Sequence, residues 1–315
     1  KKKKTNIAFL FPGQGSQKVG MGKTLADTYP TAKETFAQAD TVLGFPLSTL
    51  AWQGPKSRLD DTINTQPALL THSVAVLRVM QEQFPHLSPA CVAGHSMGQI
   101  SALVASGSLS FSEALKLARR RGELMKAAGE TSPGGMAAIL GITIPALEEL
   151  CSQASTSTEI VQVANDNCPG QVVISGSKAA LERALAAARE DGARRVIPLA
   201  VSIAAHSPLM EEPQHGVDQV VAAAPLTQPS HPIIGNVSAK PLRTPEDIRT
   251  DLQAQLTERV RWTESVQFMH AQGVNTFIEL GSGNVLSGLV KRIDRKTNRF
   301  KMGAPEDLEA LSALR

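Results

Sequence analysis

The chain has 315 residues, of which 42% are hydrophobic and 19% are charged, and its formal net charge is +3. This is an ordinary globular composition, and the chain is long enough for one large hydrophobic core and a smaller lobe. No apolar run is long enough to cross a bilayer, and the basic residues are not interleaved with aromatic ones, so we expect neither a membrane protein nor a nucleic-acid-binding protein.

The cysteine content bears on the redox setting. The chain has three cysteines, Cys91, Cys151 and Cys168, and no two of them form a Cys-x-x-Cys pair. An odd number without such pairing argues against a disulfide framework and against a zinc site. We therefore expect a reducing, cytoplasmic setting.

The first predicted element is a buried strand at residues 7–11, which ends in a glycine-rich turn at residues 12–17. The apolar run is too short for the core of a signal peptide, so we expect the preceding Lys1–Lys4 to be a solvated end. The missing initiator methionine is typical of a trimmed or excised chain. The turn could cradle a phosphate, but it has neither the Gly-x-Gly-x-x-Gly spacing nor the Gly-Lys-Ser/Thr ending of such loops.

A helix is expected at about residues 67–83, and a second strand at residues 90–93 turns directly into Gly-His-Ser-Met-Gly at residues 94–98. We call these five residues the elbow. A strand that turns sharply into a helix needs glycines beside the central residue, because Cβ atoms have no room there. Such a turn raises the hydroxyl of Ser96 out of the sheet, as in enzymes whose serine transfers acyl groups. The alternative is a turn of small residues that only packs a helix on a strand.

The remaining predicted elements divide the chain into two parts. Helices from residue 99 and at about residues 111–128 continue an alternation of strands and helices, which predicts a parallel sheet covered on both faces. After a linker at 131–135, the order becomes strand, helix, strand, strand, helix, strand, which is ferredoxin-like. These six elements are expected at 136–140, 144–153, 161–164, 171–175, 178–191 and 194–198. We therefore expect an α/β fold, with an α/β-hydrolase-like large domain at 1–129 and 200–315 and a ferredoxin-like small subdomain inserted at 130–199.

A serine hydroxyl needs a base that removes its proton. Of the seven histidines, His95 lies inside the elbow, and five others lie in helical or proline-flanked contexts typical of surface or core histidines: His72, His86, His215, His231 and His270. His206 follows an apolar strand and a loop of small residues after the inserted lobe, which makes it the candidate base. An oxyanion hole could take one donor from the backbone N–H of Met97 and a second from the turn at residues 12–17.

The C-terminal region carries a local surplus of basic residues: Lys291, Arg292, Arg295, Lys296, Arg299 and Lys301. Such a run is usually a solvated face. It would also suit an acidic partner or phosphate groups.

Six motifs lie along the chain, at residues 11–17 (Phe-Pro-Gly-Gln-Gly-Ser-Gln), 94–98, 120–122 (Arg-Arg-Gly), 167–176 (Asn-Cys-Pro-Gly-Gln-Val-Val-Ile-Ser-Gly), 206–210 (His-Ser-Pro-Leu-Met) and 281–286 (Gly-Ser-Gly-Asn-Val-Leu). In this order they resemble the malonyl-CoA:acyl-carrier-protein transacylases, a family that includes the acyltransferase domains of polyketide synthases. The likeness runs from about residue 7 to residue 293. It favours a catalytic serine over a merely structural turn.

The resemblance implies roles for residues at the matching positions. Ser96 becomes the nucleophile and His206 its base. The backbone amides of Gln14 and Met97 become the oxyanion hole. Arg121 becomes the group that holds the free carboxylate of the malonyl unit, since a guanidinium can bind a carboxylate by two parallel hydrogen bonds.

Further features of the family pattern are less fully matched. The resemblance places a pocket asparagine at Asn165, and a backbone carbonyl that orients the histidine near Arg261. Gln99 replaces the glutamate usual after the elbow, and Ser282 stands where proline is common. Residues 203–205 match neither the malonyl nor the methylmalonyl pattern of modular synthases, so extender selectivity is expected to depend mostly on Arg121.

The resemblance implies a transacylase that works by a ping-pong route. Malonyl-CoA would acylate Ser96, and the phosphopantetheine thiol of an acyl carrier protein would then take the malonyl group, without a metal or redox cofactor. One alternative is an acyl hydrolase of the same fold, and another is a catalytically silent docking domain of a synthase. Arg121 argues against the hydrolase, and the intact set of Ser96, His206 and Arg121 argues against the silent domain. Both fatty-acid and polyketide synthesis remain open as the pathway.

Overall fold

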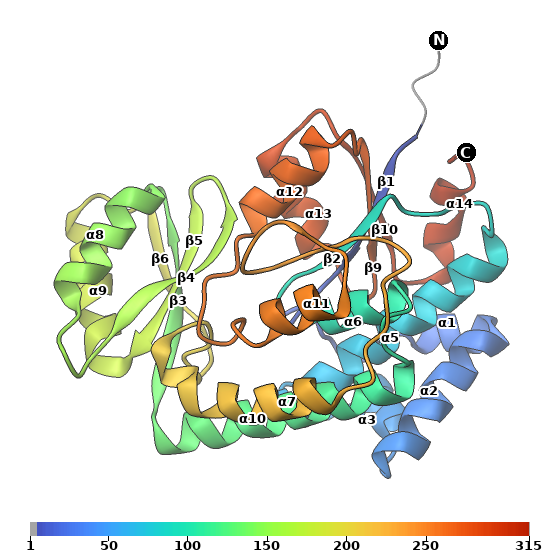
Figure 1. Cartoon of the computed structure of the whole chain (residues 1–315), viewed down its shortest axis with the longest axis horizontal. Coiled ribbons are helices and arrows are strands. Elements are labelled where there is room, and N and C mark those ends of the chain that lie inside the picture. The colour runs from blue at the N-terminus through green and yellow to red at the C-terminus, as the bar shows by residue number, and fades with distance from the viewer. Residues whose placement is uncertain (1–4, 315) are drawn as a thin grey trace.

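Two β-sheets organise the chain in the computed structural model, which describes residues 5–314 (Figure 1). The predicted solvated end, Lys1–Lys4, lies outside the described residues. The strands are β1 (Ile7–Phe11), β2 (Cys91–Gly94), β3 (Gly134–Leu140), β4 (Val161–Cys168), β5 (Gln171–Ser177), β6 (Arg195–Pro198), β7 (Ile233–Ile234), β8 (Pro241–Leu242), β9 (Thr276–Leu280) and β10 (Asn298–Met302).

Helices surround both sheets. They are α1 (Lys23–Thr28), α2 (Pro30–Leu43), α3 (Leu47–Gln53), α4 (Lys56–Leu59), α5 (Thr62–Gln83), α6 (Gly98–Ala105), α7 (Phe111–Thr131), α8 (Ile144–Ala154), α9 (Lys178–Glu190), α10 (Glu211–Ala223), α11 (Pro245–Leu252), α12 (Trp262–Ala271), α13 (Val285–Ile293) and α14 (Leu308–Leu311), with 3₁₀ turns at Pro208–Met210 and Pro305–Asp307. In the described part of the chain, none is both long and apolar enough to span a membrane.

The large sheet has the strand order β10-β9-β1-β2-β7-β8. Strand β1 pairs in parallel with β2 and β9, β10 pairs in parallel with β9, and β7 pairs in parallel with β2. The predicted parallel sheet is therefore confirmed, with one difference: the short edge strand β8 runs antiparallel to β7. The carboxyl ends of β1 and β2 lie side by side, which brings the glycine-rich turn and the elbow to the same edge of the sheet.

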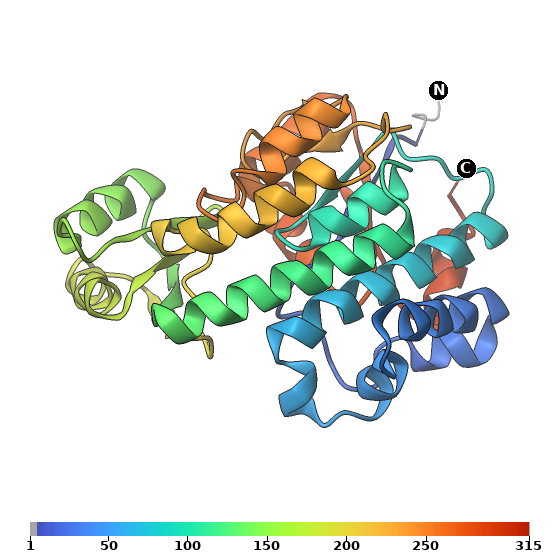
Figure 2. The same ribbon diagram turned by 60° about the horizontal axis from the view of Figure 1, so that its bottom comes forward.

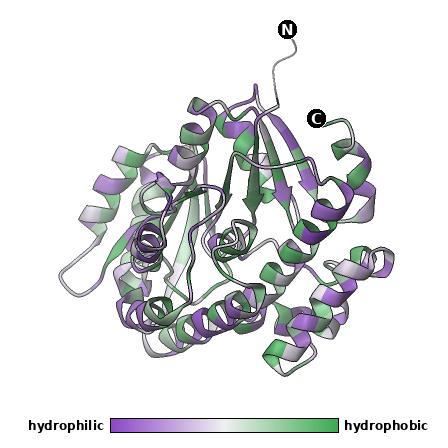
Figure 3. Ribbon diagram, turned by 45° about the vertical axis from the view of Figure 1, so that its right-hand side comes forward, coloured by the Kyte–Doolittle hydropathy of each residue, from purple (hydrophilic) through white to green (hydrophobic). Residues whose placement is uncertain are grey.

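Side chains of β1 alternate between the two faces of the large sheet, as the pleat requires. Ile7, Phe9 and Phe11 belong to the main core under α5, α6 and α7. Ala8 and Leu10 belong to a separate core with residues of α12 and α13. Helices thus cover both faces, and Figure 3 shows hydrophilic and hydrophobic residues alternating along the outer helices, as expected where one helix face is buried.

The small sheet has the order β4-β5-β3-β6, and all of its pairings are antiparallel. This is the strand order of the ferredoxin-like arrangement predicted from the sequence. Helices α8 and α9 pack on this sheet through a separate apolar cluster. The lobe lies at the left in Figure 1, and the long helix α7 reaches it from the large domain alongside α10 (Figure 2). The subdomain limits at residues 130 and 199 stay predictions.

Helix α5 begins at Thr62, five residues before the predicted start at residue 67. The side chain of Asp61 caps it by accepting a hydrogen bond from the backbone N–H of Ile63. Pro67 lies inside the helix and cannot bond to the carbonyl of Ile63. That oxygen instead accepts a hydrogen bond from Arg119 Nη1 at 2.7 Å, which compensates for the missing donor.

Candidate active site

The elbow joins β2 to α6 and holds its serine in a strained conformation. Ser96 has a φ of 53°, in the left-handed region that residues other than glycine rarely adopt. A Cβ added to Gly94 would lie 1.9 Å from the carbonyl oxygen of Gly98, and one added to Gly98 would lie 2.1 Å from the carbonyl oxygen of Phe11. Both glycines are therefore required by close backbone packing, as the sequence pattern predicts.

His206 lies against the serine, as predicted, although 110 residues separate the two in the chain. Its Nε2 is 2.9 Å from Ser96 Oγ, and its Nδ1 is 2.7 Å from the carbonyl oxygen of Gln255. A carbonyl only accepts hydrogen bonds, so Nδ1 carries the ring proton and Nε2 accepts the hydrogen bond from the serine hydroxyl. His206 is also strained, with a φ of 59°.

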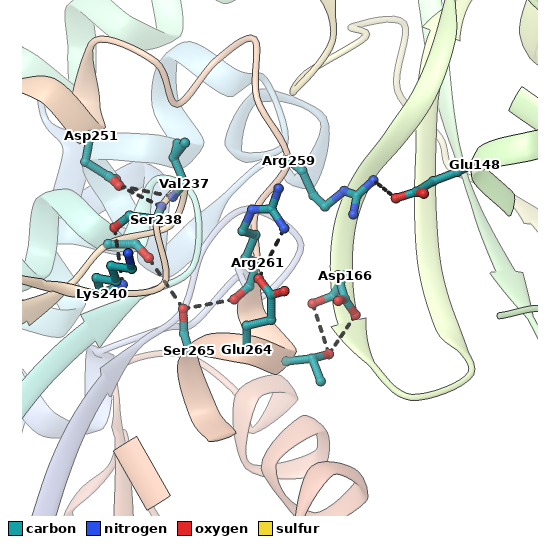
Figure 4. A network of polar contacts seen from close by, with 12 residues as sticks. Glu148, Asp166, Val237, Ser238, Lys240, Asp251, Arg259, Arg261, Glu264 and Ser265 are labelled. Carbon is teal, nitrogen blue, oxygen red and sulfur yellow. Dashed lines mark hydrogen bonds and ion pairs between the residues drawn. The ribbon is translucent and has the colours of Figure 1, made fainter. Parts of the chain in front are cut away.

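The carbonyl that orients the histidine belongs to Gln255, so the predicted position near Arg261 is wrong. The carbonyl oxygen of Arg261 accepts hydrogen bonds from the backbone N–H and the side chain of Ser265, both at 2.9 Å (Figure 4). Helix α12 begins directly after Arg261, so its first turn uses this oxygen. The run of turns that follows α11 supplies the carbonyl instead.

The base is kept neutral by its surroundings. Burial, and then the nearby cation of Arg121, lower the pKa of His206 from 6.5 to about 3, although the hydrogen bond to Gln255 opposes this shift. The imidazole is therefore ready to accept a proton at neutral pH.

Arg121, on α7, extends its guanidinium to the serine. Its Nη2 donates to Ser96 Oγ and to Gln255 Oε1, both at 3.1 Å, and its Nη1 donates to Gln66 Oε1 at 2.8 Å. The side chain is only 4% exposed, and burial lowers its pKa to about 10, so it stays charged at neutral pH. Among the described residues, no ion pair joins it to a carboxylate. The site thus holds a buried cation that faces only neutral oxygens.

The two amides expected to form the oxyanion hole lie at the same edge of the sheet. A Cβ on Gly13 would lie 2.4 Å from the carbonyl oxygen of His95, so the turn and the elbow are in direct contact. Within residues 5–314, the backbone N–H groups of Gln14 and Met97 donate to no protein acceptor. The Gln14 side chain accepts a hydrogen bond from Thr62 at 3.0 Å. The arrangement leaves both N–H groups available to an oxyanion, and that role stays a prediction.

Asn165 lies in β4 and is buried, but no hydrogen bond joins its side chain to Ser96, His206 or Arg121 among the described residues. Its role in a pocket stays a prediction. Two other side chains of β4 do reach the site. Gln162 Nε2 donates to the carbonyl oxygen of His206 at 2.8 Å, and Asn167 Oδ1 lies 2.7 Å from His95 Nε2.

Three amide side chains that sequence analysis did not single out shape the site. Asn236 Oδ1 accepts the backbone N–H of Ser96 at 2.7 Å, and its Nδ2 donates to the carbonyl oxygen of Gly94 at 2.6 Å. Gln66 and Gln255 hold the guanidinium of Arg121 from two sides. No motif pointed to these amides, because their partners come from distant parts of the chain.

The geometry agrees with comparisons with known proteins. Residues 8–300 match the family described as acyl transferase domain. The malonyl CoA-acyl carrier protein transacylase of Bacillus subtilis (strain 168) is 45% identical over 305 residues, which cover 97% of this chain and 96% of that protein. The transacylase of the same name from Escherichia coli (strain K12) is 45% identical over 306 residues, covering 97% and 98%.

Solved structures show the same likeness. An acyl carrier protein S-malonyltransferase from Vibrio cholerae has a TM-score of 0.94 at 43% identity, over 98% of this chain and 100% of that chain. A malonyl-transacylase in complex with its type II PKS acyl-carrier protein has a TM-score of 0.94 at 41% identity, over 98% and 99%.

Proposed function

We propose that this chain, which belongs to the acyl transferase family, transfers the malonyl group of malonyl-CoA to the phosphopantetheine thiol of an acyl carrier protein. Its relatives are malonyl-CoA:acyl-carrier-protein transacylases and match it over nearly its full length. The intermediate is a malonyl ester on Ser96. The acyl carrier protein and malonyl-CoA are the two partners of the reaction.

The first half-reaction loads the enzyme. Ser96 Oγ attacks the thioester carbonyl of malonyl-CoA while His206 Nε2 takes the hydroxyl proton. The backbone amides of Gln14 and Met97 donate hydrogen bonds to the oxyanion of the tetrahedral intermediate. When the intermediate collapses, the C–S bond breaks and the CoA thiolate leaves with the proton from His206.

The second half-reaction unloads the enzyme by the same route in reverse. His206 removes the proton of the phosphopantetheine thiol, and the sulfur attacks the ester carbonyl. The C–O bond to Ser96 breaks, and the serine oxygen regains its proton from His206. One thioester replaces another, so the site must mainly keep water away from the acyl-enzyme.

The observation that carries the malonyl assignment is the unpaired cation of Arg121 beside Ser96 Oγ. A buried charge is costly unless it is paired, and the free carboxylate of a malonyl group would pair it by two hydrogen bonds. An acyl hydrolase that acts on uncharged acyl groups has no use for this cation. A silent docking domain has no use for a neutral imidazole aligned with a strained serine.

The test is the Arg121→Ala variant. Removing one partner of a buried ion pair costs about 3–5 kcal/mol, so kcat/KM for malonyl-CoA should fall by roughly 10² or more. Acetyl-CoA has no carboxylate, so its transfer should be unchanged or faster. The measurement is kcat/KM for both thioesters in the parent and the variant, and the ratio of malonyl to acetyl transfer should fall steeply.

Arg120→Ala is the matched control for this test, since Arg120 lies on the same helix but is exposed and pairs with Glu123. It should leave the ratio unchanged. An equal fall in malonyl and acetyl transfer by Arg121→Ala would mean that Arg121 is structural, and the malonyl assignment would lose its physical support.

The basic stretch at residues 291–301 is a candidate surface for the carrier protein. Lys291 and Arg292 end α13 and are exposed, although Arg292 also donates to Gln171 Oε1. If they steer an acidic carrier protein, charge reversal at both positions should raise the KM for the carrier protein and weaken its salt dependence. The KM for malonyl-CoA serves as the internal control. Carrier kinetics that are unchanged across a salt series would mean that the stretch is only a solvated face.

A cytoplasmic location is proposed on the basis of the cysteines. All three are free and buried, as is typical of proteins that fold in reducing compartments.

A further inference from the structure

A chain of hydrogen bonds connects Arg121 to a second buried charge, Asp251. Arg121 Nη2 donates to Gln255 Oε1 at 3.1 Å, Gln255 Nε2 donates to Gln99 Oε1 at 2.8 Å, and Gln99 Nε2 donates to Asp251 Oδ2 at 3.0 Å. Two glutamine amides thus lie between a cation and an anion. Every donor in this chain points from Arg121 toward Asp251.

Asp251 lies at the end of α11 and is 4% exposed. Its carboxylate also accepts the backbone N–H group of Asn236 at 3.1 Å. It accepts those of Val237 and Ser238 at 3.1 and 3.4 Å (Figure 4). Burial raises the pKa of Asp251, while the hydrogen bonds from Gln99 and these amides oppose the shift. No ion pair joins Asp251 to a basic side chain within residues 5–314, so its charge is stabilised by amides alone.

The charges at the two ends fix the direction of both amides. An ionised carboxylate only accepts hydrogen bonds and a guanidinium only donates them. Asp251 therefore requires the NH₂ group of Gln99, which turns Gln99 Oε1 toward Gln255. Gln255 then presents its NH₂ group to Gln99 and its oxygen to Arg121. The carbonyl oxygen of Ser96 and Asn236 Oδ1 accept from the same NH₂ group, at 3.0 and 3.1 Å, and favour the same direction. A single amide rotation anywhere in the chain would set a donor against a donor.

We propose that Asp251 is a positioning residue for malonyl transfer: through Gln99 and Gln255 it orients Arg121 and balances its charge until the malonyl carboxylate arrives. The inference rests on the proposed function, because it explains how the site keeps its carboxylate-binding group ready. Asp251 touches neither Ser96 nor His206 by a hydrogen bond among the described residues. It acts on the reaction only through the two amides.

The Asp251→Asn variant tests this role. An asparagine side chain keeps the volume but carries a donor, and in either orientation that donor faces Gln99 Nε2 or a backbone N–H. Gln99 is then free to turn its NH₂ group toward that of Gln255. The carbonyl oxygen of Ser96 and Asn236 Oδ1 still hold Gln255, but the donor–donor contact with Gln99 shifts its oxygen away from Arg121. We expect kcat/KM for malonyl-CoA to fall about tenfold, the effect of one charge-assisted hydrogen bond, mainly through KM. Acetyl-CoA kinetics should change by less than about threefold.

The double variant Gln99→Glu, Asp251→Asn distinguishes a role of Asp251 in orienting Gln255 from a role in supporting the fold. It moves the carboxylate one step along the chain, so that residue 99 accepts from both Gln255 and residue 251. The direction of the Gln255 amide is restored, and the ratio of malonyl to acetyl transfer should recover to within about threefold of the parent. Asp247→Asn is the control, because it removes an exposed carboxylate from the same helix without touching the chain.

The outcomes are distinct. If Asp251→Asn lowers malonyl and acetyl transfer equally, or if the double variant is no better than the single one, Asp251 only supports the fold and the inference is overturned. If the parent itself shows no preference for malonyl-CoA, the proposed function fails instead. A crystal structure of Asp251→Asn then decides the inference without activity: it requires Arg121 Nη2 to leave Gln255 Oε1, and an unchanged contact overturns it.

Discussion

The Ser96→Ala variant should take up no malonyl group from malonyl-CoA, while the parent should be labelled at Ser96. Only a hydroxyl is lost, and alanine leaves β2, α6 and the two glycines of the elbow in place, so the fold should be retained. Within residues 5–314, no other side-chain hydroxyl forms a hydrogen bond with His206 Nε2 or Arg121 Nη2. Mass spectrometry of the intact protein after brief mixing with malonyl-CoA, followed by peptide mapping, measures the result.

Ser101→Ala is a matched control for this experiment. Ser101 is buried in the same helix, α6, and its hydroxyl has no hydrogen-bond partner among the described residues. Labelling should therefore be normal in this variant. Labelling of Ser96→Ala at a different residue would contradict the assignment of the nucleophile.

The parts of the site that sequence analysis located depend on local backbone geometry. The elbow was identified because its glycines are dictated by contacts within a few residues and by the neighbouring carbonyl of Phe11. The order of elements in the small lobe was likewise predicted from strand and helix periodicity. Such features are visible in the sequence because each residue type must suit the φ angle or the face of the sheet at its own position.

The parts that sequence analysis missed depend on long-range contacts between amides. Gln66, Asn236 and Gln255 come from a helix and two irregular segments, and each forms a hydrogen bond in the site with a residue at least 55 positions away. A glutamine has no local preference that marks such a role. The carbonyl that orients His206 was misplaced for a related reason, because any residue can supply a backbone oxygen and only packing selects Gln255.

Helix boundaries show a third kind of difficulty. A proline usually marks the first turn of a helix, so the pattern predicted a start near Pro67, whereas α5 starts at Thr62. The carbonyl of Ile63 that Pro67 leaves free is satisfied by Arg119, which belongs to α7. Local propensity is thus overridden by a tertiary hydrogen bond that no local pattern reveals.

The His206→Ala variant should slow malonyl transfer by about 10² to 10⁴, the usual contribution of a positioned general base. The oxyanion donors and Arg121 remain, so a slow background reaction should persist. The exposed His215 on α10 offers the control, and His215→Ala should leave the rate unchanged. Near-normal turnover of a folded His206→Ala protein would mean that a different group removes the serine proton.

The pH dependence of acylation provides a sharper test of the same residue. A histidine with an ordinary pKa of 6.5 would lose its neutral form roughly 25-fold between pH 7 and pH 5. Because burial and Arg121 lower the pKa of His206 to about 3, the rate of Ser96 acylation should fall by less than about twofold over that range. A steep fall centred near pH 6.5 would mean that His206 is not held neutral by its burial.

The same shift has a consequence for stability, which should fall over a pH range in which the rate hardly changes. The unfolded chain binds a proton at His206 below pH 6.5, whereas the folded chain does so only near pH 3. The contribution of the neutral His206 to stability is therefore complete above pH 6.5 and is lost as the pH falls from 6.5 toward 3. Chemical denaturation of the parent at pH 7 and pH 5 should show this loss. His206→Ala should lose less stability over the same interval, since its remaining dependence comes from other buried groups such as His72, whose pKa burial lowers to about 4. Equal losses of stability in the two proteins would show that the pKa of His206 is not lowered in the folded state. A base with an ordinary pKa would then have to account for the reaction.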